Sequence, residues 1–249
     1  MCTVILLRRP GHRWPLILGA NRDEMLDRAA LPPGRHWPER PDIVAGLDRL
    51  AGGSWLGVND QGVAAAILNR VGTLGPAAGK RSRGELVLDA LDYPDAAEAA
   101  AMLGALEPDA YRPFNLVIAD NRDAFWLAHR GTNGIAVKAI PPGISMLTAR
   151  ELDDKTSPRI RRYHDRFAGA PAPEPEQDDW RAWQALLDDT EPDPDLGPES
   201  AMRFALTNGF GTVSSSLIAL AAPGAPTRAA WRFEAVAGQP SPWAPIDLG

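Results

Sequence analysis

The feature of this sequence that most constrains its fold is the order of short β-rich runs and helical stretches. Successive runs are joined by turn residues, for example at Pro10-Gly11 and at Asn59-Asp60-Gln61, which predicts β-hairpins. The expected strands are 3–9, 14–20, 51–58, 62–68, 114–119, 124–129, 135–140, 144–147, 213–221 and 229–234. Runs of antiparallel strands alternating with helices that cover their faces favour a layered α+β domain, with two sheets inside and helices outside.

Four helices are expected between these strands. Ser82 is placed to cap a helix that ends near residue 91, and Pro94 fits the first turn of a helix over 95–106. Ser157-Pro158 begins a third helix, which ends near residue 167. A short fourth helix is predicted around 180–187.

Three stretches lie outside the expected strands. Residues 25–50, rich in proline, arginine and aspartate, are interpreted as a long ordered loop, and the proline-rich tail after 234 as an extended segment. We expect residues 1–249 to form a single domain. The acidic, proline-rich residues 170–199 are interpreted as a solvated excursion from it, with Trp180, Trp183 and Leu187 docked on its body.

Composition and charge argue against several classes of function. The net charge of -6 argues against a nucleic acid or an anionic membrane as the main partner. No stretch approaches the roughly 18 apolar residues of a membrane span, so no stable membrane insertion is expected. The apolar start is interrupted by Arg8 and Arg9, too early for a signal peptide. The four histidines are scattered without ligand spacing, which argues against a zinc site; they are His12, His36, His129 and His164.

The one cysteine of the chain, Cys2, is a candidate nucleophile. Removal of Met1 would leave Cys2 with both a thiol and a free α-amino group. Because an α-amine has a pKa of about 7.7 to 8 and a thiol one of about 8.5, the amine can accept the thiol proton at a cost of only about 1 kcal/mol. With no second cysteine there is no internal disulfide, and the expected location is the reducing cytoplasm.

Two other interpretations of Cys2 stand beside this one. A lone cysteine often serves as a small buried apolar side chain. A cysteine can also carry a lipid anchor, but that requires a preceding signal peptide, and only Met1 precedes Cys2.

Seven short motifs, in order, give the chain a family resemblance. They are Met1-Cys2-Thr3, Asn21-Arg22-Asp23-Glu24, Gly52-Gly53-Ser54-Trp55-Leu56-Gly57, Leu68-Asn69-Arg70, Ser82-Arg83-Gly84, Phe114-Asn115-Leu116 and Phe210-Gly211-Thr212. Together they resemble the NRDE family, the relatives of Transport and Golgi organisation protein 2, within the N-terminal nucleophile (Ntn) hydrolases. The resemblance implies a four-layer αββα fold with Cys2 on an edge of an inner sheet.

The resemblance also implies roles for particular residues. Cys2 would attack an amide or thioester carbonyl, and Asn69 is the first candidate for the donor that stabilises the oxyanion, with Asn115 the second. Asp23 would hold the α-ammonium, while Arg22 would neutralise Asp23 or lower the pKa of the thiol. The alternatives are that Arg22 and Asp23 pair with each other or with the following loop, and that each asparagine is ordinary turn chemistry.

The remaining motif residues have mainly structural interpretations. Gly52-Gly53 predict a close backbone approach, Trp55 a core position, and Arg83 either a surface charge or an anion contact. The chain departs from the family pattern at Thr148-Ala149, where Ser-Asn is frequent, and at Val213, where arginine is frequent. Either departure would remove a substrate contact if the family residue makes one.

Three functions are compatible with these observations. The first is an amidohydrolase, or a related acyl-transfer enzyme, that needs no cofactor and acts on a small or lipid-like substrate. The second is a non-catalytic carrier that uses the same cleft for haem, acyl-CoA or lipid, with Cys2 or a histidine as a possible haem ligand. The third is a scaffold that binds partners through its tryptophans and acidic segment.

Overall fold

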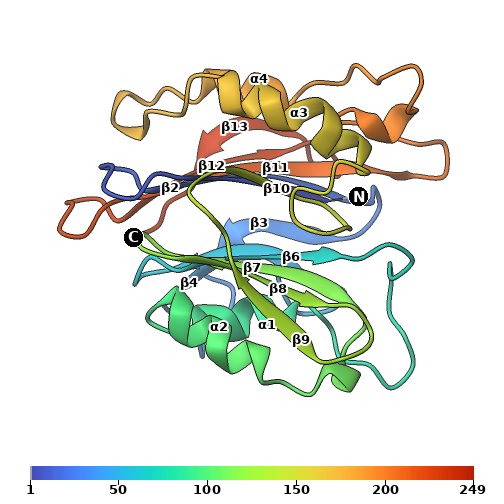
Figure 1. The fold of residues 1–249 in the computed structure, drawn as a ribbon, viewed down its shortest axis with the longest axis horizontal. Coiled ribbons are helices and arrows are strands. Elements are labelled where there is room, and N and C mark those ends of the chain that lie inside the picture. The colour runs from blue at the N-terminus through green and yellow to red at the C-terminus, as the bar shows by residue number, and fades with distance from the viewer. Residues whose placement is uncertain (1) are drawn as a thin grey trace.

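The computed structural model describes residues 2–249, and its core is two antiparallel sheets packed face to face (Figure 1). The six-stranded sheet has the order β10 (Gly143–Leu147), β1 (Thr3–Arg8), β2 (Leu16–Met25), β11 (Phe210–Leu220), β12 (Ala229–Ala235) and β13 (Ser241–Pro245). The seven-stranded sheet runs in sequence order through β3 (Ala30–Gly34), β4 (Ile43–Asp48), β5 (Leu56–Asn59), β6 (Ala64–Asn69), β7 (Phe114–Ala119), β8 (Ala124–His129) and β9 (Ile135–Ala139).

Helices cover the outer face of each sheet, which confirms the predicted αββα layers. The helices α1 (Glu85–Leu91) and α2 (Ala96–Gly104) pack on the seven-stranded sheet, and α3 (Pro158–Gly169) and α4 (Arg181–Leu187) pack on the other (Figure 1). Three short 3-10 helices complete the elements: η1 (Pro108–Ala110), η2 (Pro175–Gln177) and η3 (Pro198–Ser200). No helix within residues 2–249 is long and apolar enough to span a membrane.

The alternation of side chains along a strand explains how one sheet serves two apolar layers. In β2, Leu16 and Leu18 belong to the cluster between the sheets, whereas Ile17 belongs to the cluster beneath α3 and α4. Successive side chains of a strand point to opposite faces, so a strand buried on both faces is apolar throughout rather than alternating. Which side chains of β2 face the other sheet and which face the helices must therefore be assigned from the structure.

The interpretation of residues 25–50 as a loop is wrong. Ile43-Val44-Ala45 is buried within β4, and β3 pairs with it at the sheet edge. Pro32 and Pro33 lie in β3, where the pairing register shifts between Leu31 and Gly34. Prolines are tolerated in a sheet at such edges and irregularities, so they did not exclude a strand here. The proline-rich tail likewise contains the edge strand β13.

The helix starts also differ from the prediction. Gly84, not Ser82, is the N-cap of α1, and the Ser82 hydroxyl accepts a hydrogen bond from the Gly84 amide at 3.3 Å. Asp95 caps α2 instead of lying inside it, and its carboxylate accepts from the Glu98 amide at 2.8 Å. In the excursion 170–199, Trp180, Trp183 and Leu187 are buried against the six-stranded sheet, as predicted.

Candidate active site

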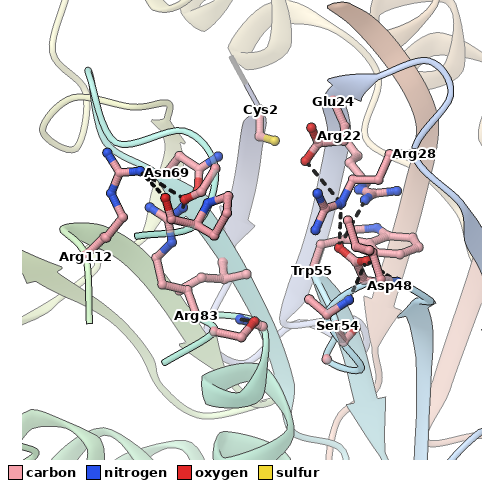
Figure 2. A pocket seen from close by; sticks show the side chains of 18 of the residues that line it. Cys2, Arg22, Glu24, Arg28, Asp48, Ser54, Trp55, Asn69, Arg83 and Arg112 are labelled. Atoms are coloured by element: carbon pink, nitrogen blue, oxygen red, sulfur yellow. Dashed lines mark hydrogen bonds and ion pairs between the residues drawn. The ribbon is translucent and has the colours of Figure 1, made fainter. Parts of the chain in front are cut away.

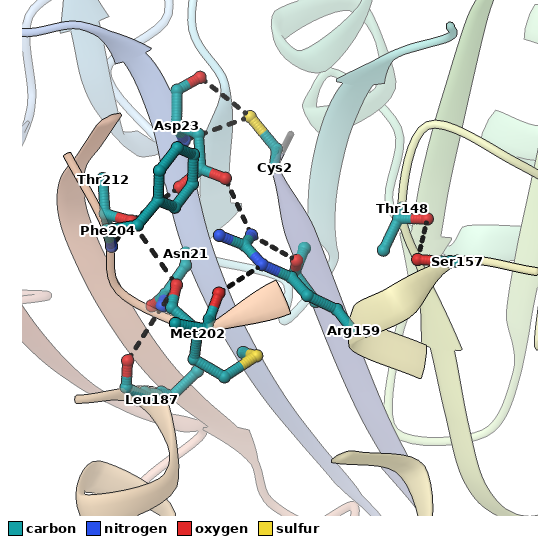
Figure 3. A network of polar contacts seen from close by, with 12 residues as sticks. Cys2, Asn21, Asp23, Thr148, Ser157, Arg159, Leu187, Met202, Phe204 and Thr212 are labelled. Carbon is teal, nitrogen blue, oxygen red and sulfur yellow. Dashed lines mark hydrogen bonds and ion pairs between the residues drawn. The ribbon is translucent and has the colours of Figure 1, made fainter. Parts of the chain in front are cut away.

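Pairing between β1 and β2 brings Cys2 next to the Asn-Arg-Asp motif. Thr3 lies opposite Asn21 in the antiparallel register, and β2 continues as one strand through Met25. The Asp23 amide donates to the Cys2 sulfur at 3.4 Å, and the thiol lies 3.4 Å from the Asp23 carbonyl oxygen (Figure 3). The hairpin thus joins the first two sequence motifs into one site. Met1 lies outside the described residues, so removal of Met1 stays a prediction.

Cys2 opens onto a cavity of about 370 Å³ that is lined by side chains from both sheets (Figure 2). Arg22 and Asp23 from β2, and Asn69 from the end of β6, line this cavity together with Cys2. Four of the five predicted site residues therefore meet at one place. The fifth, Asn115, does not line the cavity.

A close contact between two glycines shapes one wall of this cavity. The Ser54 amide donates to the Gly84 carbonyl at 3.0 Å, and a Cβ added at Gly53 would lie 2.5 Å from the Gly84 carbonyl carbon. No side chain fits at Gly53 without moving this backbone. The Gly-Gly-Ser-Trp and Ser-Arg-Gly motifs are consequently two halves of one contact, and they place Arg83 in the cavity wall.

The carboxylate of Asp23 lies in a buried polar network with Arg159 and Thr212 (Figure 3). Its Oδ2 accepts from Nη1 of Arg159 at 2.7 Å, and its Oδ1 accepts from the Thr212 hydroxyl at 2.8 Å. Arg159 also donates to the Thr3 hydroxyl at 2.8 Å and to the Ala201 carbonyl at 2.7 Å. None of the side-chain partners is more than 2% exposed. Arg159 rather than Arg22 is therefore the arginine that pairs with Asp23, and of the two roles expected for Arg22 the effect on the thiol pKa is the one that remains.

Arg22 instead lies on the cavity side of the strand. Its guanidinium carbon lies 4.1 Å from the centre of the Trp55 ring, and its Nη2 is 3.7 Å from Oδ2 of Asp48. Asp48 also pairs with Arg28 at 2.8 Å, and Arg28 approaches Glu24 at 3.7 Å. Trp55 is a wall of the cavity that remains partly exposed, rather than a fully buried core residue.

The surroundings of Cys2 raise the pKa of its thiol. Burial is the largest cause, and the negative charge of Asp23 adds to it, while the Asp23 amide and Arg22 act in the opposite direction. The reactive form of cysteine is the thiolate, so a thiol with a raised pKa needs a base to react at neutral pH. The α-amine expected after removal of Met1 would be such a base.

Asn69 and Asn115 differ in what their amides bind. Within residues 2–249 the side chain of Asn69 makes no hydrogen bond, and it lines the cavity beside Cys2. Asn115 is fully buried; its amide nitrogen donates to the carbonyls of Thr148 and Arg150 at 2.9 and 2.8 Å. Its oxygen accepts from the side chains of Arg70 at 2.6 Å and Trp126 at 3.1 Å. Asn69 therefore has a donor available for an oxyanion, and Asn115 has none.

Sequence reasoning missed Arg159 and Thr212 as partners of Asp23. Thr212 belongs to the Phe-Gly-Thr motif, but nothing local marks its hydroxyl as a ligand of a carboxylate 189 residues away. Arg159 has no local signal, because it lies on an amphipathic helix among other arginines. The alternation rule was the available clue: side chains of neighbours on a strand point to opposite faces, so the Arg22 guanidinium and the Asp23 carboxylate were not expected to pair with each other.

The positions that depart from the family pattern lie outside the Cys2 cavity. Thr148 is buried, and its hydroxyl donates to the Ser157 hydroxyl at 3.1 Å. Ala149 lines a separate depression with Arg70 and Glu151, and Val213 sits at an irregularity in the pairing of β11 with β2. Neither Ala149 nor Val213 is therefore part of the lining of the Cys2 cavity.

The described residues offer little to a metal. No group of three or more histidine, cysteine, aspartate or glutamate side chains within residues 2–249 is arranged to hold a metal ion. No histidine lines the Cys2 cavity. Among the residues that line it, Cys2 is the one whose side chain is of a type that serves as an axial ligand of haem iron.

Solved structures with little sequence identity to this chain share its fold. The Caenorhabditis elegans orthologue of N-acylethanolamine-hydrolyzing acid amidase superposes with a TM-score of 0.59 at 14% identity, covering 91% of this chain and 95% of that one. The mutant C2A of conjugated bile acid hydrolase from Clostridium perfringens gives a TM-score of 0.55 at 11% identity, covering 99% and 92%. At these identities the likeness establishes the Ntn hydrolase fold.

Sequence relatives identify the family. The Transport and Golgi organization protein 2 homologues of Bos taurus and Homo sapiens are each 36% identical, over 121 and 114 residues. Each match covers 44% of this chain and spans 40% of the relative's length. The model of the family Transport and Golgi organisation 2 matches residues 1–225, so the chain belongs to that family.

Proposed function

We propose that this protein is an Ntn-type hydrolase that uses Cys2 to cleave an amide or related acyl bond of a small or lipid-like substrate. The observation that carries the proposal is the Cys2 thiol beside the unbonded side chain of Asn69 in one cavity. The names of the structurally similar proteins, an acid amidase and a bile acid hydrolase, support the same class of reaction. The single cysteine leaves no internal disulfide, which agrees with a reducing cytoplasm as the location.

The reaction proceeds in two steps. The α-amine of a processed Cys2 takes the thiol proton, the sulfur bonds to the carbonyl carbon, and the Asn69 amide donates to the developing oxyanion. The C–N bond then breaks as the α-ammonium returns the proton to the leaving nitrogen, which releases an amine and leaves a thioester on Cys2. In the second step water attacks the thioester, its hydroxyl completes the carboxylic acid, and its proton returns to the sulfur.

The Asp23 backbone fixes the sulfur for this reaction. Its amide and carbonyl both approach the thiol, and its carboxylate is anchored by Arg159 and Thr212. Because these partners come from the helix layer and from β11, the nucleophile is held by contacts that a substrate does not displace. Such preorganisation is the main contribution that a protein makes to an acyl transfer.

The test combines mass spectrometry with hydrolysis. The untagged protein should lose Met1 and then release amine from members of an N-acyl amino acid and N-acyl amine panel, whereas Cys2→Ala should release none. A trapped thioester should appear as an acyl mass on Cys2. Equal hydrolysis by Cys2→Ala would overturn the proposal. Tight binding of acyl-CoA or lipid by the trimmed protein without turnover would favour the carrier function instead.

The haem alternative has less support from this cavity. Haem iron accepts a cysteine as the thiolate, and the raised pKa of the Cys2 thiol adds the cost of losing its proton to iron binding. The cavity offers no histidine in its place. A haem titration compared between the unmutated protein and Cys2→Ala tests this alternative directly, because thiolate ligation would shift the Soret band only when Cys2 is present.

A further inference from the structure

Two arginines in the cavity wall are held by neutral groups. Arg112 donates to the main-chain carbonyls of residues 72–76, with four distances between 2.8 and 3.2 Å. Arg83 donates to the hydroxyl of Thr73 and the carbonyl of Pro113, both at 3.0 Å. These bonds fix the direction of both guanidinium groups, but they leave both positive charges uncompensated.

The two guanidinium groups are neighbours. Both donate to the carbonyl of Gly75, Arg112 at 3.0 Å and Arg83 at 3.5 Å. Burial and then the charge of Arg112 lower the pKa of Arg83 to about 10, at which it remains protonated at neutral pH. Two like charges side by side repel each other, and an anion placed between them would remove that repulsion.

No carboxylate within residues 2–249 lies within 4.0 Å of either guanidinium group. The other arginines of the cavity do have carboxylate partners: Arg81 pairs with Glu85 at 2.6 Å, and Arg22 and Arg28 share Asp48. Figure 2 shows the Cys2 thiol between the Asp48 side and the Arg83 and Arg112 side. The cavity therefore has one neutralised wall and one wall with two uncompensated guanidinium groups. Within residues 2–249 the exposed Lys80, whose ammonium donates to the Asp109 carbonyl, is a further cation of the lining without a carboxylate partner.

The rest of the cavity suits an acyl chain. Leu50 lines it with 77% of its surface exposed, and Trp55 and Ile67 lie deeper. Between the sheets beneath Cys2 the free space is only about 20 Å³, which is room for about one water molecule. An acyl chain therefore has room only in the open cavity. There it would lie over Leu50, in the same cavity as the two arginines.

We propose that Arg83 and Arg112 form an anion-binding subsite, and that the substrate of Cys2 is an acylated molecule carrying a carboxylate, sulfonate or phosphate group. Arginine forks suit such groups because several N–H donors face one planar or tetrahedral anion. The assignment of the acyl bond rests on the proposed function; the anion subsite rests on the cavity and its charges alone.

Binding to the Cys2→Ala protein tests the subsite without any turnover. N-octanoylglycine should bind about tenfold more tightly than the uncharged N-octanoylglycinamide, since a hydrogen bond to a charged group is worth more than one to a neutral group. The preference should disappear in Cys2→Ala with Arg112→Gln or Arg83→Gln. It should remain in Cys2→Ala with Arg81→Gln, which removes an equal charge from the same cavity. N-octanoyltaurine and N-octanoyl-O-phosphoethanolamine distinguish sulfonate and phosphate from carboxylate.

Two further measurements distinguish loss of the subsite from misfolding of a variant. Arg112→Lys keeps the charge and should keep part of the preference, and added salt should reduce the preference in the protein that retains both arginines. Equal binding of the charged and uncharged ligands, or an equal loss in Arg81→Gln, would overturn the subsite. If the preference holds while the unmutated protein hydrolyses nothing, the proposed function fails and the subsite stands. If the unmutated protein hydrolyses amides but the preference for the charged ligand is absent, the subsite fails and the proposed function stands.

Discussion

Two polar regions meet at Cys2, and they differ in how completely their groups are paired. Behind the cysteine, the side chains of Asp23, Arg159, Thr212 and Thr3 are almost inaccessible and bind one another. In front of it, the Asn69 amide has no hydrogen bond within residues 2–249, and Arg83 and Arg112 have no carboxylate. Proteins generally pair their buried polar groups. The paired region therefore holds the site in place, while the unpaired region is available to a ligand.

The largest effect on stability is expected behind the cysteine. Arg159→Met should lower the free energy of unfolding by about 3 to 5 kcal/mol, because it removes the guanidinium partner of a buried carboxylate. Denaturant unfolding followed by circular dichroism measures this loss.

The double variant Arg159→Met with Asp23→Leu is the matched control. It should recover part of the lost stability, since no uncompensated charge then remains in the network. A loss below about 1 kcal/mol in Arg159→Met would mean that this region is not the anchor of the site.

In front of the cysteine, the effect should fall on catalysis instead. Asn69→Ala should raise the barrier to hydrolysis by about 3 to 4 kcal/mol, which lowers turnover by roughly 100- to 1000-fold, because it removes the oxyanion donor. Its free energy of unfolding should change by no more than about 0.5 kcal/mol. Turnover on the most active substrate of the panel measures the first quantity, and denaturant unfolding the second.

Asn115→Ala is the control, because it removes the same group from a saturated position. It should cost about 2 to 3 kcal/mol of stability, because the buried Trp126 N–H and the Thr148 carbonyl lose this partner, as do the partly buried Arg150 carbonyl and Arg70. Turnover of the folded fraction should stay near that of the unmutated protein. If Asn115→Ala rather than Asn69→Ala abolished turnover at unchanged stability, the contrast between the two asparagines would be reversed.

The smallest effect concerns the pH dependence of Cys2 alkylation. Only the thiolate reacts, and burial together with Asp23 raises the pKa of the thiol. While Met1 is retained, the rate of reaction with iodoacetamide should therefore be low at pH 7 and still be rising above pH 9. Each unit of raised pKa lowers the thiolate fraction at pH 7 about tenfold.

Treatment with methionine aminopeptidase should move this profile to lower pH, because the freed α-amine then lies beside the thiol. An unstructured peptide with one internal cysteine, whose thiol has a pKa of about 8.5, gives the reference profile. A profile of the untreated protein that levels off at a lower pH than that of the peptide would contradict the raised pKa.

Much of the fold was predictable because it follows from local patterns. Turn residues between apolar runs located most of the hairpins, and the layered arrangement follows from strands and helices that must bury their apolar faces. Residues 25–50 were missed because prolines in β3 conceal a strand whose edge position tolerates them. The edge position itself is a property of the sheet and not of the local sequence.

The candidate site was predictable in its members but not in its contacts. Cys2, Arg22, Asp23 and Asn69 all line the cavity, because the hairpin register and the strand ends bring them to one place. The exclusion of Asn115 could not be predicted, since both asparagines lie in similar contexts near strand ends. Arg159 and Thr212 were missed because they reach Asp23 from 136 and 189 residues away.

Layered sheets, and a polar motif opposite the thiol of Cys2, can be inferred from the amino-acid sequence alone. Both follow from apolar periodicity, turn chemistry and strand pairing, which act over short distances along the chain. Which polar groups are paired, and which remain open to a ligand, became clear from the folded molecule. Hydrogen-bond partners and burial depend on side-chain direction and on contacts between distant elements, and neither is encoded by a local pattern.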